Sequence, residues 1–161
     1  MVQIVLAALS LWAIPVESAT TFSPLEFIKY AKPELSIGTQ KQYVGWILKA
    51  AEKYSESPAL ITAIIMVESG FDSDAIGPVG EVGLMQLRPK FFGDAELLRD
   101  PRTNIFKGTR YISQLRQRHW DTYHSLKFIE HYNCGSSCNP VKFKYFKRVM
   151  RIYGRLSNAA Y

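Results

Sequence analysis

Glu68 is the residue of this sequence whose surroundings most favour acid–base chemistry. It follows an apolar segment, residues 59–67, in which Thr62 is the only polar residue. The segment predicts a helix that is buried nearly all round, with Glu68 one turn beyond Ile64 on an apolar face. Burial and the negative end of a helix dipole both raise the pKa of a carboxyl group, which suits it to donate a proton near neutral pH. The position also fits a surface Glu at a frayed helix end, and the segment by itself leaves both interpretations open.

Glu68 opens a series of short motifs. Glu-Ser-Gly-Phe at 68–71 is followed by Gly-Leu-Met-Gln at 83–86 and by Tyr-Asn-Cys-Gly at 132–135. Between the last two motifs stand Asp100-Pro101, Asn104-Ile105, Gly108 and Tyr111-Ile112. In order and separation the series resembles the soluble lytic transglycosylase family, whose catalytic domain has a goose-lysozyme-like fold. The resemblance covers about residues 55–155.

The resemblance implies chemistry on peptidoglycan. Enzymes of this family cleave the β-1,4 bond between N-acetylmuramic acid and N-acetylglucosamine with one carboxyl group instead of the usual pair. Carried over, Glu68 is the catalytic residue: it protonates the glycosidic oxygen and then accepts the proton of the muramyl C6 hydroxyl. That hydroxyl closes on C1, so the product is a 1,6-anhydro end and no water is consumed.

The family motifs also imply which residues bind the substrate. Gln86 and Asn133 are expected to offer amide groups to sugar hydroxyls and N-acetyl groups. Met85 is expected to offer an apolar surface to the sugar, with a plain core position as the alternative. Ser69 is expected to cap the helix end or to hydrogen-bond with Glu68.

Two tyrosines match family positions near the acid. Tyr132 and Tyr145 are the candidates, and a phenol there is expected to hydrogen-bond with Glu68 and hold its protonated form.

Two other positions depart from the family pattern. Gly77 stands where the family commonly has Ser, and His131 precedes the Tyr-Asn motif where the family has a small residue. His131 either lines the cleft or is a partly exposed helix residue.

The composition fits one globular domain with an anionic partner. The chain has 161 residues, 47% apolar and 21% charged, which excludes disordered, collagen-like and low-complexity classes. Its net charge is +6, and residues 101–161 hold 12 basic and two acidic residues. The expected partner is the peptidoglycan glycan strand, because export excludes nucleic acid. A solvated basic face without a partner is the alternative.

The N-terminus predicts export. Residues 2–14 are an apolar run too short to span a bilayer as a helix, and Pro15 ends it. Small residues at 16 and 18 predict a signal peptide over 1–18, although no Lys or Arg precedes the run. Residues 19–161 would then be the lytic transglycosylase catalytic domain, a monomer without a membrane span, located in the periplasm or secreted.

Cys134 and Cys138 enclose three residues and predict a small disulfide loop in an oxidising compartment. The closed loop would stabilise the fold by about 2 kcal/mol before strain is subtracted. The alternative is half of a metal site with His124 or His131. A zinc site normally has a second ligand pair at similar spacing, so the expectation is no metal and no cofactor.

The residues that could do chemistry must be positioned by a mostly α, lysozyme-like single domain of about six helices. A Gly-rich loop or short hairpin at 70–83 is expected to line the cleft. A capping box at Ser23 and Glu26 opens the first helix. The expected helices are 23–32, 39–54, 57–69, one from Pro101, 122–132 and 139–156.

Two other functions are compatible with the motifs. A lysozyme-type muramidase would need a second carboxylate to activate water, and Asp72 and Asp74 are the acids close to Glu68 in sequence. A non-catalytic peptidoglycan-binding module of an envelope-spanning assembly would need no acid at all. The sequence does not select among secretion, conjugation, pilus and phage assemblies as partners.

Overall fold

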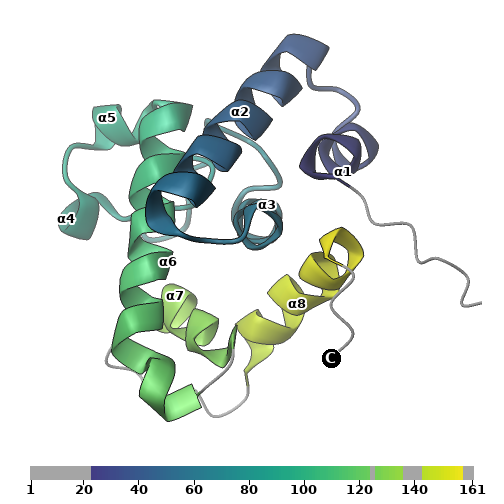
Figure 1. The fold of residues 1–161 in the computed structure, drawn as a ribbon. Coiled ribbons are helices and arrows are strands. Elements are labelled where there is room, and N and C mark those ends of the chain that lie inside the picture. Colours follow the sequence, from purple (N-terminus) through teal and green to yellow (C-terminus); the bar gives the residue numbers. More distant parts are fainter. Residues whose placement is uncertain (1–22, 124–125, 136–142, 158–161) are drawn as a thin grey trace, which may run out of the picture.

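The fold is built from helices that surround one apolar helix. The computed structural model describes residues 23–123, 126–135 and 143–157, so the predicted signal peptide lies outside them. The described elements are α1 (Pro24–Ala31), α2 (Ile37–Tyr54), α3 (Pro58–Glu68), α4 (Pro89–Phe92), α5 (Ala95–Arg99), α6 (Pro101–Tyr123), the 3-10 helix η1 (Leu126–Ile129), α7 (Glu130–Cys134) and α8 (Lys144–Leu156). Figure 1 shows α3 end-on between α2 and α8, with the long α6 along one side. Among the described residues, no helix has the length and apolar character that crossing a bilayer requires.

Helix α3 forms the centre of the core, as its apolar sequence predicts. Every residue from Ala59 to Ile65 is buried, including Thr62, whose hydroxyl donates to the carbonyl of Pro58 at 2.8 Å. The hydroxyl of Ser57 caps the first turn by accepting from the N–H of Leu60. Burial ends in the last turn, so that Glu68 is half-buried.

The N-terminal helix predictions are confirmed within two residues. The capping box of α1 is present, with Ser23 and Glu26 each accepting from the other's backbone N–H. Helix α2 begins at Ile37, two residues before the predicted start, because Ser36 and not Thr39 is its cap. The prediction that Pro101 opens a helix is also confirmed.

The second half of the chain differs from the predicted helices at three points. The predicted helix over 122–132 is divided, because α6 continues to Tyr123 and is followed by η1 and α7. Helix α8 begins at Lys144, after Phe143 with its left-handed backbone of φ 45°, and the predicted start near Asn139 lies outside the described residues. The short helices α4 and α5 were not predicted, because four and five residues are too few to show a helical period.

The Gly-rich segment forms the predicted irregular loop. Two isolated antiparallel bridges join Ile76 to Val82 and Val82 to Leu87. Gly80 and Gly83 have positive φ values of 86° and 75°, which glycine adopts without the steric cost that other residues meet. The loop returns the chain from the end of α3 to the start of α4.

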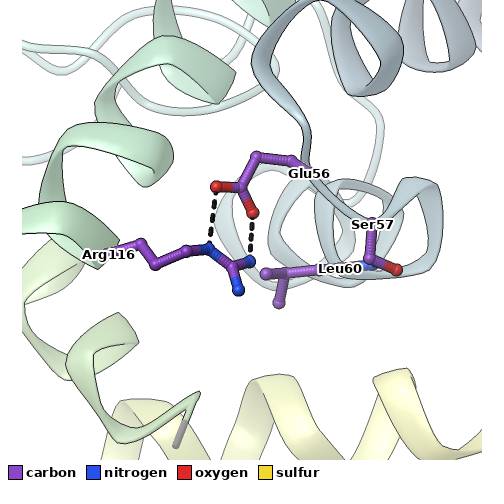
Figure 2. A network of polar contacts seen from close by, with 4 residues as sticks. All are labelled: Glu56, Ser57, Leu60 and Arg116. Carbon is purple, nitrogen blue, oxygen red and sulfur yellow. Dashed lines mark hydrogen bonds and ion pairs between the residues drawn. The ribbon is translucent and has the colours of Figure 1, made fainter. Parts of the chain in front are cut away.

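A buried ion pair ties the start of α3 to α6. Two nitrogen atoms of the Arg116 guanidinium group, Nε and Nη2, donate to the carboxylate of Glu56 (Figure 2). The distance from Nε to the carboxylate is 3.1 Å. The side chain of Glu56 is fully buried, whereas that of Arg116 is 31% exposed. Because Glu56 precedes the Ser57 cap directly, this pair fixes where α3 begins against α6.

Removal of the cation should destabilise the fold strongly. Arg116→Met leaves the carboxylate of Glu56 buried without its partner, so we expect the free energy of unfolding in urea to fall by about 3 kcal/mol. Arg99→Met breaks the exposed pair with Glu96 and serves as the control, with an expected loss below about 1 kcal/mol. Equal losses in the two variants would contradict a structural role for the buried pair.

Candidate active site

A cavity of about 720 Å³ opens beside the end of α3. Its wall combines residues from α3, the Gly-rich loop, α4, α6, α7 and α8. Of the residues predicted from the motifs, the cavity wall contains Glu68, Gln86, Tyr132 and Asn133. Segments that are distant in sequence therefore meet at one concave surface.

Burial dominates the electrostatics of Glu68. The pKa of its carboxyl group is raised from 4.5 to about 7, chiefly by burial, and the charge of Glu81 acts in the same direction. A hydrogen bond from Tyr145 and the positive charge of Arg148 act in the opposite direction and lower the pKa. The net result is a carboxyl group that exchanges its proton near neutral pH.

Tyr145 contacts the acid directly. Its hydroxyl donates to Oε1 of Glu68 at 2.5 Å. Burial raises the pKa of Tyr145 well above its ordinary value, so the phenol keeps the proton that it donates. The contact matches the expected position of Tyr145, but its effect on Glu68 is opposite to the expected one. A donated hydrogen bond stabilises the carboxylate and lowers its pKa, and burial is what favours the protonated form.

Tyr132 lies beside Tyr145 but does not bind the acid. Its hydroxyl donates to the carbonyl of Met85 at 2.9 Å. Its ring stacks on that of Tyr145 with 6.3 Å between centroids and 7° between the planes. Tyr132 thus links α7 to the loop and supports the ring of the residue that contacts Glu68.

Asn104 holds the Gly-Leu-Met-Gln motif in place from α6. Its side-chain oxygen accepts from the N–H of Met85, and its side-chain nitrogen donates to the carbonyls of Val82 and Leu98, each at 2.8 Å. Gly83 permits this approach, because a Cβ atom there would lie 2.6 Å from the amide nitrogen of Asn104. The Asn104 amide thus gives hydrogen-bond partners to three backbone groups, the N–H of Met85 and the carbonyls of Val82 and Leu98.

Two predicted binding residues have other contacts. Met85 is fully buried, and its sulfur lies so close to Gly108 that a Cβ atom there would be 2.4 Å away. The substrate-binding prediction for Met85 is therefore corrected to the core alternative. The hydroxyl of Ser69 donates to the carbonyl of Leu84 at 2.8 Å and to that of Ile65 at 3.4 Å. Ser69 is thus the cap at the end of α3, one of its two predicted roles, and it joins this helix end to the loop without bonding to Glu68.

Gln86 and Asn133 lie on the cavity wall, and their binding of sugar groups stays a prediction. Gln86 has a left-handed backbone with φ 47°, and its side-chain nitrogen donates to the carbonyls of Ala75 and Gly83 at 3.1 and 3.0 Å. These bonds hold its amide against the loop, with the amide oxygen as the group it can offer to a ligand. Asn133 is exposed on the cavity wall.

Glu81 is a cavity residue that the motifs did not indicate. Its Oε1 atom pairs with Nη2 of Arg88 at 2.9 Å, and its Oε2 atom accepts from the N–H of Val79 at 3.1 Å. Burial raises the pKa of Glu81, but these hydrogen bonds and the Arg88 charge outweigh it and lower the pKa. The cavity thus contains a second carboxylate besides Glu68.

Gly77 explains how Glu81 enters the cavity. A Cβ atom at Gly77 would lie 2.4 Å from Oε2 of Glu81 and 2.6 Å from Oε1 of Gln86. The carboxylate and the amide therefore occupy the space that the family's usual Ser would take. Gly77 in place of Ser was the sequence signal that space is left open here. The sequence alone could not predict that Glu81 fills this space.

Among the described residues, the other acids and histidines considered from the sequence do not join the cavity wall. Asp72 accepts from the N–H of Asp74 at 2.9 Å, a turn contact on the exposed loop. His131 is buried and stacks on His119 with 3.9 Å between centroids, so it is neither a cleft residue nor a partly exposed one. In the part of the chain that the structure describes, no three His, Cys, Asp or Glu side chains gather closely enough to hold a metal ion.

The predicted disulfide falls at the edge of the described region. Cys134 lies on the cavity wall, whereas Cys138 is outside the described residues. His124, the other candidate for a metal site, is also outside them. The Cys134–Cys138 bridge stays a prediction.

The sequence that forms this site, with its half-buried acid, tyrosine donor and glycine-rich loop, is similar to known proteins. Residues 45–152 match the family model described as the Transglycosylase SLT domain. The chain belongs to this family. The mostly α, lysozyme-like fold and the family resemblance predicted from the motifs are thereby confirmed.

Curated relatives carry matching names. Membrane-bound lytic murein transglycosylase C of Actinobacillus pleuropneumoniae serotype 5b is 30% identical in an alignment of 125 residues, and the match covers 66% of this chain and 34% of that protein. Endo-type membrane-bound lytic murein transglycosylase A of Citrobacter koseri is 35% identical in an alignment of 95 residues, and the match covers 51% of this chain and 47% of that protein. The chain thus spans between about a third and a half of the length of these relatives.

A solved structure shares the fold. An inactive mutant of the lytic transglycosylase Slt from Pseudomonas aeruginosa superposes with a TM-score of 0.52 at 22% identity. The match covers 71% of this chain and 22% of that one. At this identity the likeness shows the fold of the SLT domain and nothing further.

The raised pKa of Glu68 has a consequence for stability. The folded-state pKa is about 7 and the ordinary value is 4.5, so the folded protein holds this proton more tightly than the unfolded chain does. The contribution is fully present below pH 4.5 and is lost as the pH rises through about 7. The difference of about 2.5 between the two pKa values corresponds to about 3 kcal/mol.

Glu68→Gln should therefore stabilise the protein at high pH. Glutamine resembles the protonated acid, so we expect equal stability of variant and wild type at about pH 4 and an advantage of the variant of about 3 kcal/mol at about pH 8. Urea denaturation at both pH values measures the difference. Glu96→Gln, at an exposed position, is the control and should show no such pH-dependent advantage. A constant difference between Glu68→Gln and wild type at both pH values would contradict the raised pKa.

Proposed function

We propose that this protein is an exported lytic transglycosylase that cleaves the bond between N-acetylmuramic acid and N-acetylglucosamine in peptidoglycan. Glu68 acts as the single general acid and base. The observation that carries the proposal is the placement of its carboxyl group at the end of α3, in a cavity, with a pKa of about 7 and a hydrogen bond from Tyr145. Membership of the SLT family and the names of the relatives support the same reaction.

In the proposed reaction Glu68 first donates one proton and then accepts another. Protonated Glu68 gives its proton to the glycosidic oxygen while the bond from that oxygen to C1 of the muramyl residue breaks. The resulting carboxylate takes the proton of the C6 hydroxyl, whose oxygen bonds to C1. The products are a 1,6-anhydromuramyl end and a free N-acetylglucosamine end, and Glu68 is protonated again.

Tyr145 assists between the two steps. The hydrogen bond that it donates becomes stronger when Glu68 carries a negative charge. The Tyr145 hydroxyl and the nearby positive charge of Arg148 therefore stabilise the carboxylate that exists between the two proton transfers. Burial then favours return of the proton, which prepares the acid for the next substrate.

The basic outer face of α8 supports a polyanionic substrate. Exposed cations follow one another along this helix, and no acidic residue lies between Lys144 and Leu156. The exposed residues are Lys144, Lys147, Arg148, Arg151 and Arg155. Peptide stems of peptidoglycan carry carboxylates, so this face would raise the rate of capture.

Export is part of the proposal and depends on the sequence alone. Residues 1–18 have the apolar run and the small residues of a signal peptide, which would deliver residues 19–161 to the periplasm as the catalytic domain. The relatives named as membrane-bound lytic murein transglycosylases support a location at the cell envelope.

Glu68→Gln tests the single-acid assignment. Loss of the proton donor should lower the rate of clearing of purified sacculi by about 100-fold or more. Tyr111→Phe changes another residue of the cavity wall without touching the acid and should keep most of the activity. Clearing at the wild-type rate by Glu68→Gln would refute the role of Glu68 as the single acid. No clearing of sacculi by the wild type itself would favour a non-catalytic peptidoglycan-binding module.

A lysozyme-type muramidase is a second candidate, and the carboxylate of Glu81 in the same cavity favours it. In that reaction water would replace the C6 hydroxyl, and an ionised second carboxylate would orient the water. The lowered pKa of Glu81 keeps it ionised at neutral pH. The two candidates therefore differ in the product and in the need for Glu81.

Mass analysis of the muropeptides from digested sacculi separates the two reactions. The transglycosylase should release anhydro ends in wild type and in Glu81→Gln alike, because no water is activated. The hydrolase would release reducing ends one water heavier, and these would disappear in Glu81→Gln. Reducing ends as the main wild-type product would overturn the transglycosylase proposal.

A further inference from the structure

We propose that Glu130 is a positioning residue that sets the place of Tyr145 and, through Tyr145, the environment of the Glu68 carboxyl group. The inference rests on the proposed function for its meaning in catalysis. Its geometry, however, can be tested without any activity. None of the sequence motifs includes Glu130, which lies two residues before the Tyr-Asn motif.

The carboxylate of Glu130 binds the first turn of α8. Its Oε1 atom accepts from the N–H of Tyr145 at 3.2 Å, and its Oε2 atom accepts from the N–H of Phe146 at 2.6 Å. The first N–H groups of a helix have no partner within the helix, and the helix dipole is positive there. Glu130 is 9% exposed, so water cannot readily replace it.

Helix α8 has no cap of its own at this end. Phe143 precedes the first residue, has a left-handed backbone with φ 45° and offers no side-chain hydrogen bond. An acid from α7 therefore does what a Ser or Asp at the start of the helix would normally do. Because the cap comes from another element, it fixes the position of α8 relative to α7 as well as stabilising the first turn of α8.

The capped turn carries the residue that contacts the acid. The N–H of Tyr145 binds Glu130, and its hydroxyl binds Oε1 of Glu68 at 2.5 Å. Tyr132, also on α7, stacks on the Tyr145 ring and is itself anchored by the carbonyl of Met85. Helix α7 thus holds Tyr145 at its backbone through Glu130 and at its ring through Tyr132.

A loss of the cap should weaken the hydrogen bond at Glu68. A displacement of the Tyr145 backbone by a fraction of an ångström lengthens its contact with Glu68, because the ring is rigid and transmits the movement. The groups that act on Glu68 are Tyr145, Arg148 and Glu81. Tyr145 and Arg148 both lie on α8 and both lower the pKa of Glu68, so a displacement of α8 away from Glu68 would raise that pKa.

The test compares Glu130→Gln with Tyr145→Phe by measuring the pKa of Glu68 from the NMR shift of its carboxyl carbon. An amide has one acceptor oxygen, so glutamine cannot accept both N–H groups as the carboxylate does. Tyr145→Phe should raise the pKa of Glu68 by about one unit. Glu130→Gln should raise the pKa of Glu68 by a part of that amount. In the Tyr145→Phe background, Glu130→Gln should raise the pKa by less than it does in the wild type.

Glu56→Gln is the matched control. It also replaces a buried glutamate that binds two donors, but its partner is Arg116 and not the start of α8. We expect this control to lower the melting temperature and to leave the pKa of Glu68 unchanged. Glu130→Asp keeps the charge with a shorter side chain, and it carries the same test if the Gln variant does not fold.

The pH dependence of the reaction rate should change in the same direction as the pKa of Glu68. If Glu68 must be protonated to act, the alkaline limb of the pH–rate profile of Glu130→Gln should move to higher pH, and kcat should fall by about 10- to 100-fold because the acid is misplaced. An unchanged Glu68 pKa in a folded Glu130 variant, or an effect fully additive with Tyr145→Phe, would overturn the inference and leave Glu130 as a helix cap only. Coupled pKa values together with full activity of Glu68→Gln would instead refute the proposed function and keep the positioning role.

Discussion

The half-buried carboxyl group of Glu68 is the constraint on which the rest of the site depends. Apolar residues of α3 and its neighbours keep water from it and raise its pKa, whereas Tyr145 and Arg148 lower it. With burial alone the group would hold its proton too tightly, and with the donors alone it would be an ordinary carboxylate. The balance brings the pKa to about 7, where one group can both release and recover a proton.

The segments that meet at Glu68 are joined by polar side chains that bind backbone groups. Asn104 holds the loop to α6, Ser69 holds it to α3, and Tyr132 holds it to α7. Glu130 joins α7 to α8 in the same way. A loop beside a cavity has carbonyl and N–H groups that no regular element pairs, so side chains from the surrounding helices satisfy them and fix the loop at once.

The two carboxyl groups of the cavity show how surroundings separate similar residues. Glu81 and Glu68 each lie near an arginine, yet the pKa of Glu81 is lowered and that of Glu68 is raised. Glu81 accepts several hydrogen bonds near the surface, whereas desolvation outweighs every other effect on Glu68. Only one of them is therefore suited to donate a proton, and the other stays a fixed negative charge that favours the protonated form of its neighbour.

The sequence by itself determined what depends on local pattern: the apolar helix that ends at Glu68, the capping box at Ser23, the glycine-rich loop and, through the motifs, the family and its lysozyme-like fold. Only the tertiary structure decided which tyrosine binds the acid, that Met85 faces the core, and that Glu81 fills the space beside Gly77. The physical reason is the range of the interactions. Helix periodicity and capping act over three or four residues, whereas Tyr145 meets Glu68 across 77 positions of sequence, and such contacts follow from how complete helices pack.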